Sequence, residues 1–486
     1  MEDCQIEAFI DNDEKKQGLR IQDYTSFAYG KNIHYKSIMH EDILLEYDKE
    51  EVVIVILSTQ RYEEIAKNLM DKGIAKIYIG LIMCANSREI LQEDEYTIEK
   101  YISESMCVPI NRKKIVIRTD GFYNGHGRQI AEQLLKRRTD LDIVWIANTM
   151  IKVPTGIRVI LECNIKKMIE EMETAGFWLF EAETPIWTQK RQNQCYIQLK
   201  HWASVTLKTF YISDFKLQNY QVGIDRWLKE SAMMDYVFVG SKFDEMTCRE
   251  GFAFDREVVY VGSPRTDVMF KQEECREKVY DFYKIDRQVH TLLYAPTFRY
   301  KDVEQRKGYT DIKITSQIHI GMLSDALKKR FGGEWKILLR RHPIIKTSSN
   351  EMSNNMDVID VTGYDDGEEL VAACEVMITD YSSIMFEPAF VNKPVFLYAP
   401  DKKEYIDKER GLLIDYDELP FFVAENNEEL RDSIYKYDRN EYIQKVKRFM
   451  ERFDVKEDGH ASERAADFIL NLLDSDEETL RNIEGK

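Results

Sequence analysis

The chain has 486 residues, of which 44% are hydrophobic and 12% aromatic, so it can form packed cores in two or three domains, and wholesale disorder is excluded. Its formal net charge of −18 argues against a nucleic-acid-binding protein, which usually presents a basic face. The N-terminus lacks a signal pattern and no apolar run nears the roughly 18 residues of a membrane span, so we expect a soluble, cytoplasmic protein.

The first 110 residues predict a small N-terminal module. An amphipathic helix is expected over 60–73, and strands are expected over 6–13, 51–57 and 74–80. The first of these strands ends in acidic residues, as in a dinucleotide-binding half, but no glycine-rich turn precedes it. We therefore interpret residues 1–110 as a partial Rossmann-like α/β module with a docking or structural role.

Residues 111–270 alternate between strand and helix patterns. A strand over 113–123 ends in Thr-Asp-Gly, and a helix opens in the glycine-containing stretch that follows. Further strands are expected over 141–147, 176–183, 195–202, 235–241 and 257–265. Such alternation is typical of a parallel, doubly wound sheet.

Residues 271–486 predict a second domain of the same type, with C-terminal helices. Its strands are expected over 291–297, 335–343, 356–362, 374–380 and 394–400. The expected fold is therefore α/β, with two Rossmann-like doubly wound domains in tandem behind the N-terminal module.

Several strands of the second domain end in residues suited to an anionic ligand. Thr297 and Arg299 follow one strand, and His342 follows two arginines at the end of another. In open α/β sheets, ligands bind beyond the carboxyl ends of the strands. Ser382 and Ser383 stand where a strand turns into a helix, whose free N–H groups favour phosphate.

Each of these residues also has a structural interpretation. Asp380 or a serine can simply cap the helix, and His342 can cap its strand. Arg340 and Arg341 point to opposite sides of a strand, so at most one faces the ligand, and we assign Arg341. Glu387, one turn beyond the serines, would reach a ribose or polyol hydroxyl or would be solvated.

The segments "YAPTFR" (294–299), "RRHP" (340–343), "VMITDYSSIMFEPAFVNKPVFLYAPDKKEY" (376–405) and "RGLL" (410–413) resemble the CDP-glycerol glycerophosphotransferase family, which includes teichoic acid polymerases and primases. "GSPRTDVMF" (262–270) is similar to the family's Gly-x-Pro-Arg-x-Asp element. The resemblance covers roughly residues 113–470.

The resemblance implies a GT-B type enzyme whose two domains face a cleft, with CDP-glycerol or another CDP-polyol on the second domain and the acceptor on the first. It implies that Arg299, His342, Ser382 and Ser383 bind the donor diphosphate. Nucleotide or polyol contacts are assigned to Thr297, Arg341, Asp380, Glu387 and Arg410. No cofactor is expected and no metal cluster is evident in the sequence, so protein cations would stabilise the leaving CMP.

The chain departs from the family's motif at the position of the catalytic base. The family places a histidine after tryptophan in Trp-His-Gly-Thr-Pro-Leu-Lys, whereas this chain reads "QLKHWASVTLK" (198–208). Alignment on tryptophan puts Ala203 at the base position, and alignment on histidine puts His201 there. We favour His201, since histidine titrates near working pH. Lys208 and His126 are assigned to acceptor binding.

Three functions stay open. The first is transfer of glycerol phosphate, or a related polyol phosphate, to a lipid-linked glycan or polymer in teichoic-acid-like or capsular polymer synthesis. The others are a GT-B glycosyltransferase using a nucleotide sugar and a non-catalytic CDP-polyol-binding scaffold. Peripheral contact with the inner membrane face would use the basic run at Leu134–Arg138.

Overall fold

The computed structural model describes residues 9–10, 38–47, 54–56, 68–69, 72–74, 77–79, 95–214, 220–302, 307–310, 318–342, 356–409 and 411–484. The chain divides into two compact units, Met1–Ser103 and Glu104–Lys486. Arg410, predicted to bind the donor, lies outside the described residues.

The first unit contains short parallel strand pairs. Strand β1 pairs with β2, and β3 pairs with β4. The described elements are β1 (Phe9–Ile10), β2 (Ile38–Met39), η1 (Glu41–Glu46), β3 (Ile54–Ile56), β4 (Ile77–Ile79) and α3 (Glu95–Met106), the last of which runs on into the second unit. The three strands predicted here each contain a described strand, whereas most of the helix predicted over 60–73 lies outside the described residues.

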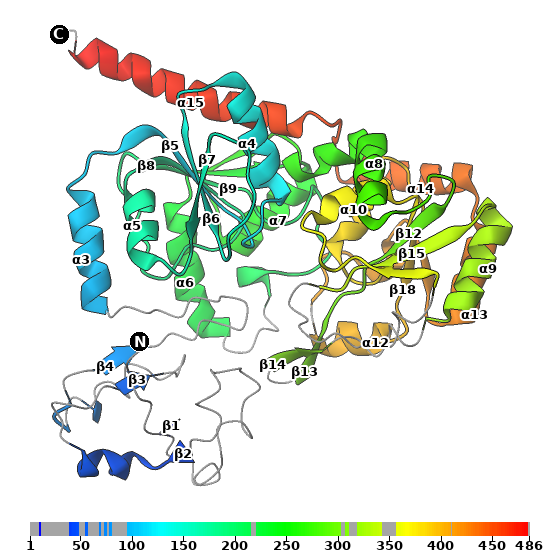
Figure 1. Cartoon of the computed structure of the whole chain (residues 1–486), viewed down its shortest axis with the longest axis horizontal. Coiled ribbons are helices and arrows are strands. Elements are labelled where there is room, and N and C mark those ends of the chain that lie inside the picture. Colours follow the sequence, from blue (N-terminus) through cyan, green and yellow to red (C-terminus); the bar gives the residue numbers. More distant parts are fainter. Residues whose placement is uncertain are drawn as a thin grey trace. The chain divides into compact units, whose positions relative to one another are not determined.

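The second unit holds two parallel sheets (Figure 1). The first has the order β11-β10-β9-β8-β5-β6-β7, and every pairing is parallel. Its strands are β5 (Asn111–Arg118), β6 (Asp142–Ala147), β7 (Ile157–Leu161), β8 (Ala175–Phe180), β9 (Cys195–Gln198), β10 (Tyr236–Val239) and β11 (Glu257–Tyr260). The predicted parallel sheet is confirmed, and β7 is an additional strand that the sequence pattern did not reveal.

Helices connect these strands. They are α4 (Gly125–Arg137), α5 (Ile165–Glu173), η2 (Tyr211–Ser213), α6 (Tyr220–Met233), α7 (Lys242–Phe252) and η3 (Pro264–Lys271). Helix α4 begins in the predicted glycine-containing stretch. Gly127 lies there against the sheet, where a Cβ atom would approach the Ile117 side chain to 2.7 Å.

The second sheet has the order β16-β15-β12-β17-β18-β19 and is also parallel throughout. Its strands are β12 (His290–Tyr294), β15 (Trp335–Leu339), β16 (Val358–Asp360), β17 (Val376–Thr379), β18 (Val395–Tyr398) and β19 (Phe422–Ala424). Strands β13 (Arg299–Asp302) and β14 (Lys307–Thr310) form a separate antiparallel pair. The five predicted strands are confirmed, and β19 was not predicted.

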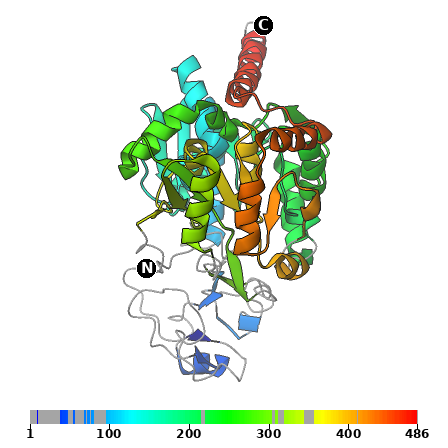
Figure 2. The ribbon, with the colours of Figure 1, turned by 90° about the vertical axis from the view of Figure 1, so that its right-hand side faces the viewer.

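The helices of this domain are α8 (Gln272–Tyr283), α9 (Ile320–Phe331), α10 (Gly367–Ala373), η4 (Ser383–Met385), α11 (Phe386–Ala389), α12 (Lys402–Glu404), η5 (Tyr405–Glu409), η6 (Tyr416–Glu418), α13 (Asn427–Lys436) and α14 (Arg439–Arg452). Helices α9 and α13 contact each other, and Figure 2 shows this side of the domain facing the viewer. Asp366 caps α10 by accepting from the N–H groups of Glu368 and Glu369, as expected for the start of a helix there.

The last helix, α15 (Ala461–Glu484), packs against the first sheet's domain rather than the second. Ala465, Ile469 and Leu473 are fully buried in the core that also contains Ile130 and Leu134 of α4. Figure 1 shows α15 in red beside α4. The C-terminal helices are therefore shared between the two domains, and the predicted boundaries near 110 and 270 stay predictions.

Helix α15 also contacts the basic run Leu134–Arg138, which was proposed for membrane contact. Arg137 lies 3.3 Å from Asp467, and Arg138 lies 2.8 Å from Asp474, both on α15. Arg138 also pairs with Asp140. Carboxylates thus pair with the two arginines of Leu134–Arg138, and the predicted membrane contact of this run stays a prediction. Among the described helices, none is long and apolar enough to cross a membrane.

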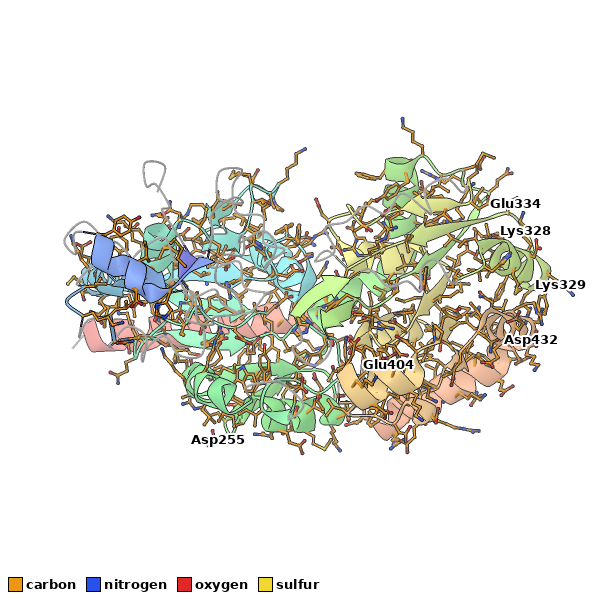
Figure 3. The ribbon with its side chains drawn as sticks, turned by 90° about the horizontal axis from the view of Figure 1, so that it is seen from below. Asp255, Lys328, Lys329, Glu334, Glu404 and Asp432 are labelled. Carbon is orange, nitrogen blue, oxygen red and sulfur yellow. The ribbon has the colours of Figure 1, made fainter. Side chains whose placement is uncertain are left out.

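Many other charged side chains are exposed. Figure 3 labels several of them, including Lys328 and Glu334 beyond the end of α9, whose charged atoms are 2.6 Å apart. Exposed pairs of this kind contribute only about 0–1 kcal/mol each. The buried apolar residues beneath both sheets therefore supply most of the stability.

Candidate active site

The segment after β9 places the predicted base at the carboxyl end of the first sheet. His201 is exposed, whereas Trp202 and Ala203 are buried, at 4% and 1% exposure. The Trp202 indole donates to Asp244, and Lys200 forms a buried ion pair with the same carboxylate. Position 203 is thus enclosed, whereas His201 is exposed, and the assignment of the base to His201 stays a prediction.

His126 lies behind this segment, not on the surface. Its Nε2 atom lies 3.0 Å from the Trp202 carbonyl, and its Nδ1 atom accepts from the Arg265 N–H at 3.4 Å. Burial and the nearby charges of Lys200 and Arg265 lower the pKa of His126 well below its usual value. Both ring nitrogens of the neutral imidazole are therefore used internally. The structure does not support the predicted acceptor-binding role, because this histidine joins two loops.

Residues 207–209 pair with the "RGLL" segment of the second domain. Leu413 donates its N–H to the Leu207 carbonyl at 2.8 Å, and Thr209 donates to the Gly411 carbonyl at 3.0 Å. Lys208, predicted to bind the acceptor, is the half-buried residue between them and bridges to Leu412. Two motifs more than 200 residues apart thus form one short antiparallel ladder.

Ser382 and Ser383 begin a short helical segment, η4 continued by α11. Ser382 is the cap, since its Oγ atom accepts from the Ile384 N–H at 3.4 Å. Ser383 instead contacts the first domain: its Oγ atom accepts from the Leu207 N–H at 3.0 Å and lies 3.2 Å from Thr206 Oγ1. The predicted donor serines and the predicted base segment are therefore brought together.

Arg299 is a structural cation. Its guanidinium donates to Asp380, Asp401 and the Thr297 carbonyl, and it lies 4.9 and 4.8 Å from the ring centroids of Tyr381 and Tyr405. All three guanidinium nitrogens of Arg299 thus have protein acceptors, so a bound diphosphate would compete with Asp380 and Asp401, and the diphosphate-binding role of Arg299 stays a prediction.

The Asp380 carboxylate is similarly occupied. Besides pairing with Arg299, it accepts from the N–H groups of Thr297 and Tyr381. Asp380 therefore holds the chain ends after β12 and β17 together and is not placed to bind a nucleotide or polyol. Thr297 is buried beside it, and its hydroxyl has no hydrogen-bond partner among the described residues.

The two arginines after β15 differ in burial and in their partners. Arg341 is buried and pairs with Asp360 of the edge strand β16 at 2.6 Å. Arg340 is the half-buried one, and its Nη1 atom donates to the Tyr364 carbonyl at 2.8 Å. Its guanidinium lies beside Gly367 at the start of α10. Arg340 is therefore the less buried of the two, and the assignment of the ligand-facing arginine to Arg341 stays a prediction.

His342 lies between cations. Its ring packs edge-on against Phe298, with centroids 4.8 Å apart. The pKa of His342 is lowered to about 4, first because the surrounding protein disfavours the imidazolium and then because of Lys208 and Arg340. Lys208 of the first domain and Arg340 of the second thus face the same imidazole. These two cations and His342 form the electropositive part of the site.

Glu387 faces the first domain from α11. It is buried, and its Oε1 atom lies 3.2 Å from Nε of Arg265. Burial raises its pKa, although Arg265 acts in the opposite direction. It is therefore neither a solvated helix residue nor the ribose contact that was predicted; its observed partner is Arg265. The sequence reasoning missed Arg265 as a site residue, although the quoted "GSPR" motif contains it.

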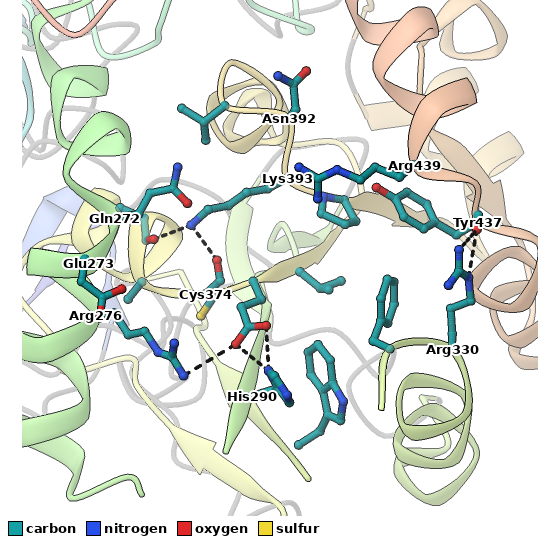
Figure 4. A pocket seen from close by; sticks show the side chains of 18 residues that line it. Gln272, Glu273, Arg276, His290, Arg330, Cys374, Asn392, Lys393, Tyr437 and Arg439 are labelled. Atoms are coloured by element: carbon teal, nitrogen blue, oxygen red, sulfur yellow. Dashed lines mark hydrogen bonds and ion pairs between the residues drawn. The ribbon is translucent and has the colours of Figure 1, made fainter. Parts of the chain in front are cut away.

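One pocket lies elsewhere, at the amino ends of the second sheet's strands (Figure 4). It has a volume of about 460 Å³. Two of its cations have internal partners: Arg330 donates to the Tyr437 carbonyl, and Lys393 donates to carbonyls that include that of Cys374. It contains none of the predicted site residues. No group of three or more His, Cys, Asp or Glu side chains able to hold a metal occurs in the described part of the chain.

Comparison with known proteins identifies the group to which this arrangement belongs. The family model for CDP-Glycerol:Poly(glycerophosphate) glycerophosphotransferase matches residues 101–471. The teichoic acid glycerol-phosphate transferase of Staphylococcus aureus is 26% identical over 406 residues, covering 79% of this chain and 98% of that protein.

Other relatives are matched over less of their length. The teichoic acid glycerol-phosphate primase of Bacillus subtilis is 30% identical, covering 60% of this chain and 71% of the relative. The teichoic acid poly(glycerol phosphate) polymerase of B. subtilis is 24% identical, and the chain spans about half of it, 49%.

A solved structure of the wall teichoic acid polymerase TagF shares the fold. It has a TM-score of 0.67 at 24% identity and covers 79% of this chain and 95% of that one. The two parallel-sheet domains thus form a GT-B type fold. Because the family model spans most of the chain, this protein belongs to the CDP-glycerol:poly(glycerophosphate) glycerophosphotransferase family.

Proposed function

We propose that this protein transfers glycerol phosphate, or a related polyol phosphate, from a CDP-activated donor to a hydroxyl of a polymer acceptor and releases CMP. The observation that carries the assignment of the site is the contact between Leu207 and Ser383. It joins the segment that starts with His201 to the serines at the end of β17. Base and donor segments are therefore neighbours, as a direct transfer requires.

In the proposed reaction, the acceptor hydroxyl attacks the β-phosphorus of the donor and His201 takes its proton. A new P–O bond forms to the acceptor, and the bond between the β-phosphorus and the oxygen bridging to CMP breaks. Lys208, Arg340 and the serine hydroxyls would stabilise the negative charge that develops on the diphosphate. His201 is the exposed imidazole at this sheet edge, which suits a base that must reach a bound acceptor.

The test is acceptor-dependent release of CMP from CDP-glycerol. We expect His201→Ala to lower kcat by roughly 100- to 10,000-fold, the usual contribution of a general base, while the affinity for CDP-glycerol is kept. His460→Ala is the matched control, because that histidine is exposed, lies just before α15 and has Glu463 as an ion-pair partner. Full activity of His201→Ala would remove the proposed base.

Two other functions make different predictions in the same assay. A GT-B glycosyltransferase would release a nucleoside diphosphate from a nucleotide sugar and no CMP from CDP-glycerol. A binding scaffold would bind CDP-glycerol without turnover with any acceptor. We favour transfer over the scaffold because the altered Trp202-Ala203 region still leaves His201 exposed.

The finer features of the substrates are also proposals. We propose a lipid-linked glycan or polymer as the acceptor, presented at the inner face of the membrane. Glycerol and ribitol donors are distinguished by comparing kcat/KM for CDP-glycerol and CDP-ribitol with one acceptor, because both polymer types occur among the relatives.

A further inference from the structure

Arg265 stands in the turn after β11, with only 13% of its side chain exposed. Its guanidinium makes three separate contacts. Nη1 donates to the His201 carbonyl at 2.6 Å, Nη2 pairs with Glu368, and Nε lies 3.2 Å from Glu387 Oε1. One planar group thus contacts the backbone of the predicted base and two carboxylates of the other domain.

The three partners come from elements that carry the site. His201 follows β9 of the first sheet. Glu368 is in the first turn of α10, beside which Arg340 lies. Glu387 is in α11, which continues the helical segment begun by Ser383. Arg265 therefore connects the base segment to the two helices that border the donor serines and Arg340.

The backbone of Arg265 is itself held. Its N–H donates to Nδ1 of His126, whose other ring nitrogen meets the Trp202 carbonyl. The base segment is thus attached to the turn of Arg265 at two consecutive carbonyls, those of His201 and Trp202. A displacement of this turn would move both residues together.

Charge compensation makes Arg265 a poor phosphate ligand. Although burial opposes its charge, Glu368 and Glu387 raise the pKa of Arg265 further above its ordinary value. Glu181 and Asp120 add more negative charge nearby. An arginine surrounded by carboxylates has little attraction left for an anionic donor, so its contacts point to a mechanical role.

We propose that Arg265 is a positioning residue that fixes the main chain of His201 against α10 and α11, and so sets the distance between base and donor. This inference rests on the proposed function, because it takes His201 as the base. Arginine suits the task because its guanidinium donates to the His201 carbonyl through Nη1 and forms ion pairs with two carboxylates through Nη2 and Nε, a set of contacts that a lysine ammonium cannot reproduce.

The test compares Arg265→Lys, which keeps the charge, with Glu368→Gln, which keeps Arg265 but removes the negative charge of its main cross-domain partner. Activity is followed as CMP release from CDP-glycerol with acceptor, and CDP-glycerol affinity is measured by calorimetry. We expect either variant to lower kcat by roughly 10- to 100-fold while the donor Kd changes by less than about threefold. Arg226→Lys is the matched control, because its pair with Glu183 lies within one domain.

A double variant separates positioning from a general loss of structure. In a His201→Ala background there is no imidazole to position, so Arg265→Lys should lower the residual rate by less than about threefold. A structural defect would instead lower the rate by the same factor in both backgrounds. If Arg265→Lys does not fold, Glu368→Gln takes its place. Its effect on the rate is then measured in the wild-type and in the His201→Ala background, and a smaller effect in the second indicates positioning.

The proposal is overturned if Arg265→Lys and Glu368→Gln keep kcat within threefold of wild type, or if their losses multiply with that of His201→Ala. The activity of His201→Ala alone tests the proposed function. A fully active His201→Ala removes the base and with it this inference, whereas an inactive His201→Ala beside a fully active Arg265→Lys removes the inference alone.

Discussion

Leu207 donates its backbone N–H to the Oγ atom of Ser383 at 3.0 Å, which joins the two parallel-sheet domains at the candidate site. The bond lies directly beside the ladder formed with residues 411–413. A serine that was predicted to bind phosphate or to cap a helix therefore also contacts the segment of the predicted base.

Ser383→Ala is predicted to lower kcat/KM for CDP-glycerol by roughly 5- to 100-fold. Removal of the hydroxyl leaves the Leu207 N–H without its acceptor, which typically costs about 1–3 kcal/mol. Ser324→Ala is the matched control, because that buried hydroxyl on α9 has no hydrogen-bond partner among the described residues. Equal kinetics for the two variants would show that the Leu207–Ser383 bond has no role in activity.

Arg299→Ala is predicted to lower the free energy of unfolding by about 3–5 kcal/mol, because it leaves Asp380 and Asp401 as uncompensated carboxylates. Urea unfolding monitors this loss. The exposed pair of Arg431 with its neighbour Asp432 provides the control, since Arg431→Ala should change stability by less than about 0.5 kcal/mol. A stable Arg299→Ala variant that no longer binds CDP-glycerol would instead support the predicted donor-binding role.

His342 is predicted to make donor binding depend on pH. Its pKa is lowered to about 4, so the free imidazole is neutral at pH 7. A bound diphosphate would raise this pKa, because anions favour the imidazolium, and binding then takes up a proton. The Kd for CDP-glycerol should therefore tighten roughly 3- to 10-fold from pH 7 to 5.

Calorimetry at the two pH values tests this, with His342→Gln and the control His460→Gln. The tightening should persist in the control and disappear in His342→Gln. The same tightening in both variants would mean that another group takes up the proton.

Glu173 is predicted to destabilise the protein at high pH. Its carboxylate is fully buried without a hydrogen-bond partner among the described residues, and burial raises its pKa to about 7, with Arg191 acting in the opposite direction. The folded state thus holds the proton more tightly than the unfolded state. The free energy of unfolding should be highest below about pH 4.5 and fall by about 1–3 kcal/mol as the pH rises through 7.

Urea unfolding of Glu173→Gln at pH 5 and pH 8 checks this sign. The variant cannot ionise at this position, so its free energy of unfolding should fall by about 1–3 kcal/mol less than that of the wild type between these pH values. Glu170→Gln, on the same helix but exposed and paired with Lys167, should keep the wild-type fall. A Glu173→Gln variant with the full wild-type fall would place the titration elsewhere.

Sequence alone determined the alternation of strands and helices, both parallel sheets and the strand ends at which polar residues gather. These features follow from local periodicity, because an apolar run of four to eight residues between helices has few alternatives to a buried parallel strand. The same alternation predicted that Arg340 and Arg341 differ in their surroundings, and one is half-buried and the other buried.

Tertiary structure decided which residue of each group is available to a ligand. Arg299, Arg340 and Arg341 all follow strands, but Asp380, Asp401 and Asp360 neutralise the first and third of them. Arg265 was not recognised because its partners His201, Glu368 and Glu387 are far from it in sequence. Periodicity predicts the direction of a side chain, whereas its charge partners come from distant segments and are known only once the chain is folded.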